Sequence, residues 1–272
     1  VLLALTTLAW ADHAWDRARA LDRAGLPVAA ATLYAEVVSA APTGPHAPEA
    51  LSELIDLAET TGDWFLVDGL ASKLSLEPFA ACCGDTLALR LGLLAFDRVD
   101  LTGVHQQLER IPPTSPLYAR ARYVDGVAFN WQGRLKSAVR AFSDAFKADP
   151  DDEIAGLAVV NIGRVYYGIG QYENAVKYLE QVPPASRYRP TALLTLAWAH
   201  FVTSDTKRAL ADLDQLGQLD ELDTKGAGRP EARWMRALIG FYDLDYEAAL
   251  GPLTWLPVEL AATQDELAVV VA

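Results

Sequence analysis

Residues 126–150 read GVAFNWQGRLKSAVRAFSDAFKADP, and this stretch decides the fold. It holds small residues at 126, 133, 138 and 145, an aromatic ring at 142 and a proline at 150. Gly133 stands between two helix-forming segments, and glycine supplies the left-handed backbone that ends a helix. The stretch therefore predicts two helices joined by a tight turn.

The same spacing returns in the next segment, residues 163–175, which reads GRVYYGIGQYENA. Two other passages echo each other directly: LERIPPTS at 108–115 and LEQVPPAS at 179–186. A fixed period of 20 to 50 residues is the mark of a repeat architecture. The chain is therefore predicted to be a stack of similar units.

In a unit of about 34 residues, Gly126, Gly133, Ala138, Phe142 and Pro150 occupy positions 8, 15, 20, 24 and 32. These are the positions that a tetratricopeptide repeat uses, and the chain resembles that family over nearly all of residues 12–256. The resemblance implies an all-α, right-handed superhelical solenoid of about seven helix–turn–helix repeats. Position 8 is held by Ala18, Ile55, Gly92, Gly126, Gly163, Ala197 and Ala237, and position 20 by Ala30, Val67, Val104, Ala138, Ala175, Ala209 and Ala249.

The repeat positions have a physical logic. Small side chains at positions 8 and 20 let the two helices of one unit cross closely. Positions 24 and 27 lie three apart on one helix face and are expected to bury against the next unit. One helix pair cannot bury its apolar face alone, so stacking stabilises each unit. Positions 24 and 27 carry Tyr34, Val37, Leu108, Ile111, Phe142, Ala145, Leu179, Val182, Leu213 and Leu216.

Composition excludes some classes of partner. The 272 residues carry a formal net charge of −13, which argues against a nucleic-acid ligand and favours a basic partner. The only cysteines, Cys82 and Cys83, are adjacent, and we expect two small apolar side chains at a helix entrance rather than a redox pair or a zinc site.

No catalytic motif is present, so the sequence predicts no catalytic residue, no cofactor and no metal site. His200 falls at position 11 of the sixth unit, normally an aromatic core site, and is expected to be a packed histidine. The carboxylates between Asp212 and Asp223 lack the spacing of a calcium loop and are expected to lie at a solvated helix end.

The first helix of each tetratricopeptide unit lines the concave groove of the family's solenoid. That resemblance implies a partner-binding groove with a run of aromatic side chains over the last four units. Exposed aromatic side chains commonly anchor a partner. The implied groove residues are Tyr123, Trp131, Tyr167, Trp198, Phe201, Trp234, Phe241 and Tyr242. Asn130, Arg164 and Arg236 add polar groups nearby, whereas the family's carboxylate-clamp pattern is absent.

The two ends are assigned separately. Residues 1–11 begin with the apolar run VLLALTTL, and Ala9-Trp10-Ala11 has the A-x-A pattern of a signal-peptidase site, which predicts a mature chain from Asp12. The alternative is that this segment belongs to the first helix of the solenoid. Residues 257–272 are expected to start a further helix or a truncated cap. No stretch is long and apolar enough to span a bilayer.

The segments SPLYARARY, TALLTLAWAHF and PEARWMRALIGFYDLDYEAAL resemble those of tetratricopeptide proteins of Gram-negative envelopes. The resemblance implies a non-catalytic scaffold in the periplasm or at the outer membrane, in secretion, pilus, motility or outer-membrane machinery. Its partners would be other proteins, with any membrane contact made through them. One alternative is a cytoplasmic regulator that binds a peptide or an enzyme. Another is a glycan hydrolase, for which the groove offers mainly Glu231.

Overall fold

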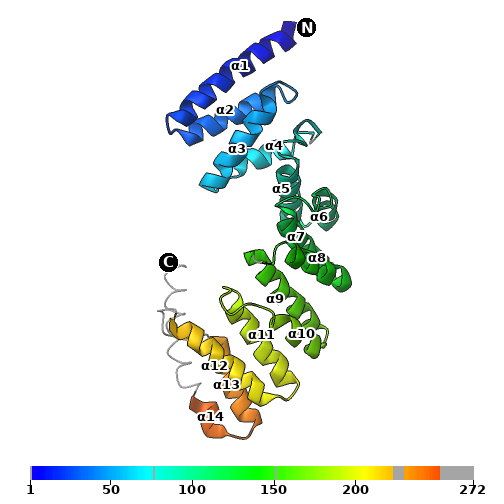
Figure 1. The fold of residues 1–272 in the computed structure, drawn as a ribbon, viewed down its shortest axis with the longest axis vertical. Coiled ribbons are helices and arrows are strands. Elements are labelled where there is room, and N and C mark those ends of the chain that lie inside the picture. Colours follow the sequence, from blue (N-terminus) through cyan, green and yellow to red (C-terminus); the bar gives the residue numbers. More distant parts are fainter. Residues whose placement is uncertain (1, 76, 151, 223–229, 252–272) are drawn as a thin grey trace, which may run out of the picture. The chain divides into compact units, whose positions relative to one another are not determined.

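The computed structural model describes residues 2–75, 77–150, 152–222 and 230–251. Its described part contains fourteen α-helices, one short 3-10 helix and no strand, which confirms the all-α class (Figure 1). The helices fall into two compact units, residues 1–148 and 149–272.

The first unit holds four helix pairs. In chain order its elements are α1 (Leu2–Arg23), α2 (Pro27–Ala40), α3 (Ala47–Thr61), α4 (Phe65–Ala71), the 3-10 helix η1 (Glu77–Phe79), α5 (Gly84–Asp97), α6 (Leu101–Leu108), α7 (Tyr118–Trp131) and α8 (Leu135–Ala148).

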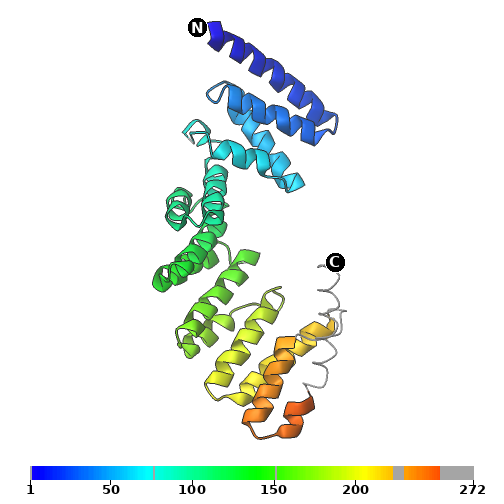
Figure 2. The same ribbon diagram turned by 180° about the vertical axis from the view of Figure 1, so that it is seen from behind.

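The second unit holds three pairs, drawn from green to orange in Figure 2. These are α9 (Glu153–Gly168), α10 (Tyr172–Leu179), α11 (Arg189–Val202), α12 (Thr206–Leu222), α13 (Pro230–Tyr242) and α14 (Tyr246–Leu250). Each consecutive pair packs together, so the seven predicted repeats are confirmed as α1–α2 through α13–α14. None of the described helices is long and apolar enough to cross a membrane.

One residue with left-handed backbone marks the turn inside every repeat. Among the described residues, positive φ occurs only at position 15 of the seven units. Gly25, Gly62, Gly133 and Gly170 have φ between 70 and 76°, as their sequence predicts. The other three repeats use Val99, Ser204 and Leu244, with φ of 60, 63 and 59°. The turn geometry is therefore constant although the residue is not.

The small residues at position 8 face a large side chain of the same repeat. A Cβ added at Gly126 would lie 2.6 Å from the buried ring of Phe142, and one at Gly163 would lie 2.5 Å from Leu179. Both partners stand at position 24. We expected position 24 to pack against the next repeat, but its side chain also fills the space that glycine leaves on its own first helix. All the residues at positions 8, 20, 24 and 27 named above are buried.

The echo between LERIPPTS and LEQVPPAS is a shared loop. In both loops the serine amide donates to the carbonyl of the first proline, at 3.0 Å. The hydroxyls of Ser115 and Ser186 each accept from the amide two residues later, at 3.2 Å. The repeated sequence therefore builds the same entry into α7 in one unit and into α11 in the other.

Two expectations about single residues are wrong. Cys82 and Cys83 stand at the entrance of α5, as expected, but they are joined by a disulfide rather than lying as two separate side chains. Sγ of the buried Cys83 lies 3.4 Å from the hydroxyl of Ser52. Asp212 is buried in α12 rather than solvated at a helix end. A vicinal disulfide closes only a small ring, which is why the sequence disfavoured it.

The N-terminal segment belongs to α1, which runs unbroken from Leu2 to Arg23. Ala11, Ala14 and Trp15 are buried against the second helix and its neighbours. Cleavage near Asp12 stays a prediction. The expected further helix at 257–272 lies outside the described residues.

Candidate functional site

Five of the eight predicted groove residues come together in the second unit. Trp198 and Phe201 lie on α11, and Trp234, Phe241 and Tyr242 lie on α13. We call these five side chains the aromatic surface. Their rings form a continuous chain of contacts, in which Trp198 links Trp234 to Phe201 with centroids 5.8 and 6.1 Å away. Tyr242 then joins Phe201 to Phe241, at 5.5 and 5.9 Å.

The helical period explains why these residues meet. Trp198 and Phe201 are three apart, so they share one face of α11, and Trp234 and Phe241 are seven apart, so they share one face of α13. Both helices are the first helices of their repeats, and similar packing in successive repeats turns similar faces in the same direction. The ring contacts between α11 and α13 confirm that these faces adjoin.

The aromatic surface is open to solvent on one side. Trp198 and Phe201 are half-buried and form its base. Trp234, Phe241 and Tyr242 are 47, 57 and 66% exposed. Isolated exposed apolar side chains are common, whereas contiguous ones mark interaction sites in soluble proteins. The arrangement is therefore suited to binding an apolar group.

The other three predicted groove residues lie elsewhere. Tyr167 packs on Tyr172 at 5.4 Å, and burial, then the neighbouring Tyr172, raises the pKa of Tyr167. In the first unit, Tyr123 packs on Phe142 of its own repeat at 5.7 Å. Trp131 is 60% exposed and contacts Phe96 of the preceding repeat at 5.0 Å.

The polar residues expected near the surface have separate roles. Arg236 on α13 pairs with Asp214 on α12, at 2.7 Å between Nη2 and Oδ1. The guanidinium of Arg236 is therefore paired within the same unit, and it does not give the aromatic surface an unpaired positive charge. Arg164 is exposed on α9, and Asn130 belongs to the first unit.

Comparisons with known proteins agree on the fold. The tetratricopeptide repeat model matches residues 158–182. Among solved structures, residues 41 to the end of MamA from Desulfovibrio magneticus RS-1 are 19% identical with a TM-score of 0.54, covering 67% of this chain and 97% of that one. PilF of Pseudomonas aeruginosa is 14% identical with a TM-score of 0.53, covering 84% and 96%. No curated protein sequence matches the chain.

Residues 158–182 match the tetratricopeptide repeat, and the chain has the fold of tetratricopeptide repeat proteins. The sequence identities to these solved structures are low, so the similarity establishes the fold and nothing more. This applies equally to BtubC from P. vanneervenii, which is 14% identical with a TM-score of 0.50 and covers 96% of this chain and 92% of its own.

The second unit also contains a buried polar pair. Nδ1 of His200 on α11 lies 2.7 Å from Oδ2 of Asp212 on α12. Burial raises the pKa of Asp212, and the hydrogen bond and charge of His200 oppose that rise. The expectation of a packed histidine at position 200 agrees with its 6% exposure. Its Nε2 atom is enclosed without a hydrogen-bond partner, so the pair has no access to a substrate.

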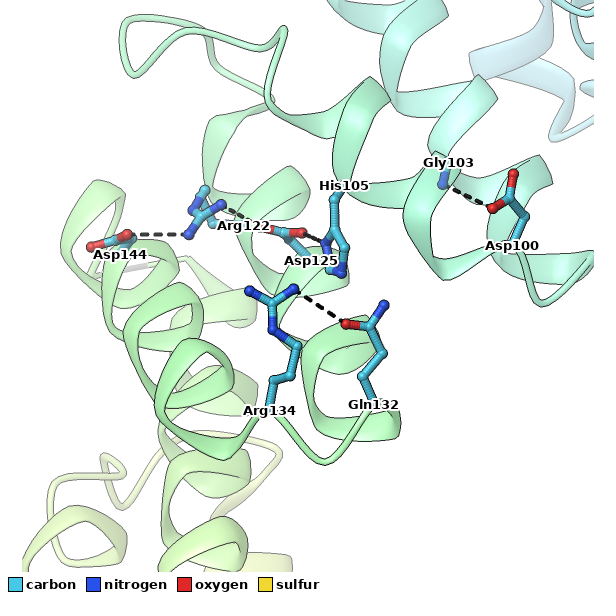
Figure 3. Close-up of polar contacts among 8 residues, drawn as sticks. All are labelled: Asp100, Gly103, His105, Arg122, Asp125, Gln132, Arg134 and Asp144. Carbon is cyan, nitrogen blue, oxygen red and sulfur yellow. Dashed lines mark hydrogen bonds and ion pairs between the residues drawn. The ribbon is translucent and has the colours of Figure 1, made fainter.

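A larger polar network lies in the first unit (Figure 3). Asp125 on α7 is 2% exposed and bonds through Oδ1 to Nδ1 of His105 on α6 and through Oδ2 to Nη1 of Arg122. The other Nη of Arg122 reaches Asp144 on α8 at 3.4 Å. The network therefore ties the second helix of repeat three to both helices of repeat four.

Sequence reasoning missed this network because its members are far apart in the chain. His105 belongs to no recognisable motif in the sequence. One signal in the sequence could have predicted it. Asp125 stands directly before Gly126 at position 8, where the first helix of the repeat is expected to be buried. A carboxylate at such a position needs a charged or hydrogen-bonding partner.

Proposed function

We propose that this tetratricopeptide repeat protein is a non-catalytic scaffold that binds a protein partner through the aromatic surface. The observation that carries the proposal is the unbroken chain of four contacts among five rings, with its three outer rings about half exposed or more. Tryptophan and tyrosine contribute much of the binding energy in protein interfaces because they bury a large area at a small entropic cost.

The layout of the rings favours a protein segment over a small molecule. The surface spreads over two helices of successive repeats. Small-molecule sites are concave and cover most of the ligand. A peptide or helix that places apolar side chains against Trp234 and Tyr242 would instead cover the exposed side of the rings.

The test is partner capture with matched variants of the full chain. Trp234→Ala combined with Tyr242→Ala removes two exposed rings and leaves the half-buried base in place. Ile169→Ala is the control, because it removes an apolar side chain that is 44% exposed in the same unit but outside the aromatic surface. We expect a stoichiometric partner from the native cells to be lost with the double variant and kept with the control. Retention of every partner by the double variant would contradict the proposal.

We further propose that the protein works outside the cytoplasm, in the periplasm or at the outer membrane, as part of a secretion, pilus, motility or outer-membrane assembly. The support is the apolar run and A-x-A pattern of residues 1–11. N-terminal sequencing of the exported protein should find a start near Asp12. An exported protein that still begins at Val1 would contradict cleavage.

A cytoplasmic adaptor is the second candidate, and one observation favours it. α1 continues without a break from Leu2 through Asp12, and Ala11 is 4% exposed. Cleavage after Ala11 would remove the first part of a helix that packs in the first repeat. Under this alternative, the chain keeps its N-terminal segment in the cell and is not exported.

A further inference from the structure

The first unit has an apolar feature that the proposed function does not use. The helix-to-helix turns of repeats one and two carry three large apolar side chains in solvent. Leu26, Val28 and Phe65 are 52, 78 and 80% exposed. Leu26 and Val28 flank the start of α2, and Phe65 begins α4. Both turns therefore present apolar groups although neither belongs to the aromatic surface.

A cavity opens beside these side chains. It has a volume of about 110 Å³ and lies between α2, α3 and α4. Its wall is mostly apolar and includes Pro27, Val28, Ala31, Leu54, Leu57 and Leu66. An apolar cavity of about 150 Å³ accepts benzene, so this smaller one suits a branched aliphatic side chain better than an aromatic ring.

The repeats around this cavity are strongly acidic. Residues 12–71 contain ten Asp and Glu but only three Arg and no Lys. These two repeats therefore carry an excess of negative charge, which favours a cationic partner.

We propose that this cavity is a second docking site, which takes an aliphatic side chain from a protein segment with Lys or Arg beside it. The cavity supplies the apolar contact, and the acidic surroundings supply the charge complementarity. Among the residues that line the cavity, Asp63 carries the negative charge. A second copy of this chain fits less well, because its own net charge is −13.

Fluorescent hexapeptides test the proposal on the full chain. The main probe is Lys-Arg-Leu-Leu-Arg-Lys, compared with the same peptide carrying two alanines for the leucines and with Glu-Asp-Leu-Leu-Asp-Glu. We expect binding of the first peptide, measured by fluorescence anisotropy, to be at least about tenfold tighter than that of either other peptide, because only it satisfies both the cavity and the charge. Equal binding of the alanine or the acidic peptide, or no binding of the first, would overturn the proposal.

Variants locate the binding. Thr32 lines the cavity and is exposed, so Thr32→Trp should cover the opening, and Ala31→Leu should fill it from within. Each should weaken the leucine peptide by about tenfold while the helical circular dichroism stays unchanged. Asp63→Asn should weaken it at low salt, whereas the control Asp152→Asn makes the same charge change at the start of α9 in the second unit. Unchanged affinity in both cavity variants would overturn the site.

A lipid surface is the competing occupant, and vesicles separate it from a protein segment. Anionic lipid should be repelled by the acidic repeats, so we expect no sedimentation with vesicles of phosphatidylcholine and phosphatidylglycerol. Sedimentation that Val28→Asp abolishes would overturn the proposal in favour of membrane contact. The aromatic surface lies in the other unit, so Trp234→Ala with Tyr242→Ala should leave the peptide affinity unchanged. This result separates the cavity from the proposed scaffold function.

Discussion

Each unit of the protein buries one histidine–aspartate pair, but the two pairs connect different things. In the first unit, His105 and Asp125 join repeat three to repeat four, and Arg122 extends the pair to Asp144. In the second unit, His200 and Asp212 join the two helices of repeat six alone. The same residue types therefore connect two neighbouring repeats in the first unit, and the two helices of one repeat in the second unit.

The difference shows how a buried carboxylate is stabilised. Asp125 has a charged or hydrogen-bonding partner on each oxygen. Asp212 has one close partner, and its desolvation is the largest influence on its pKa. Burying a charge is unfavourable unless it is paired and hydrogen-bonded. Removing the first carboxylate should therefore cost more than removing the second.

The largest effect is expected for Asp125→Ala. This change leaves the guanidinium of Arg122 and the ring of His105 buried without their shared acceptor. Breaking a buried ion pair by removing one partner costs about 3–5 kcal/mol. Urea unfolding of the full chain should show this loss, and hydrogen exchange should locate it in α6 and α7.

Asp144→Ala is the control for that measurement. Asp144 is 30% exposed and 3.4 Å from Arg122, so its loss should cost about 0–1 kcal/mol. If both variants lost equal stability, Asp125 would not be the centre of the network.

A smaller loss is expected for Asp212→Ala in the second unit. It removes one hydrogen bond and leaves Nδ1 of His200 without its partner in a buried site. Leaving such a group unsatisfied costs about 1–3 kcal/mol. Protection of the α11 and α12 amides should fall, while α6 and α7 keep theirs. A loss as large as that of Asp125→Ala would remove the distinction between the two pairs.

The acid dependence of the second pair is a further test. Because the folded-state pKa of Asp212 is raised, this carboxyl group favours folding while it is protonated. That contribution is complete below about pH 4, the ordinary range of an aspartate, and is lost as pH rises through the raised pKa. Asp212→Asn cannot titrate, so its unfolding free energy should lack this fall. Parallel pH profiles of the two proteins would contradict the assignment.

The repeat architecture was predictable because its signals are local. Small residues at positions 8 and 20 directly indicate a close helix crossing. Glycine at position 15 directly indicates a left-handed turn. The turns at Val99, Ser204 and Leu244 carry no such signal, since their side chains usually avoid positive φ. Their geometry is imposed by the packing of the two helices, and only the repeat spacing identifies them.

The aromatic surface was predictable for the residues that share a helix face in adjacent repeats. Trp198 and Trp234 adjoin as expected. Tyr123 and Tyr167 were placed in the same groove, yet they pack on Phe142 and Tyr172. A rotation of one position around a helix moves a side chain by about 100°, which is enough to exchange the groove for the space between two helices. Spacing alone does not fix that angle.

Substitutions at the turn residues are expected to have the smallest effect on stability. They also test whether the strained turns depend on the histidine–aspartate pairs. Repeats three and six, which hold His105 and His200, are also repeats whose turn lacks glycine. Left-handed backbone costs a residue other than glycine about 1–2 kcal/mol of folding free energy. A substitution by glycine removes this strain, but part of the gain is lost because glycine makes the unfolded chain more flexible. Val99→Gly should therefore stabilise the first unit by about 0.5–1 kcal/mol. Ser204→Gly should gain less, because a small polar side chain tolerates this conformation better than a β-branched one. In a double variant with Asp125→Ala, the gain from Val99→Gly should be smaller than in the wild type if the network holds the strained turn in place, because the turn can then relax without the substitution. Simple addition of the two effects in urea unfolding would mean that the turn and the network act independently.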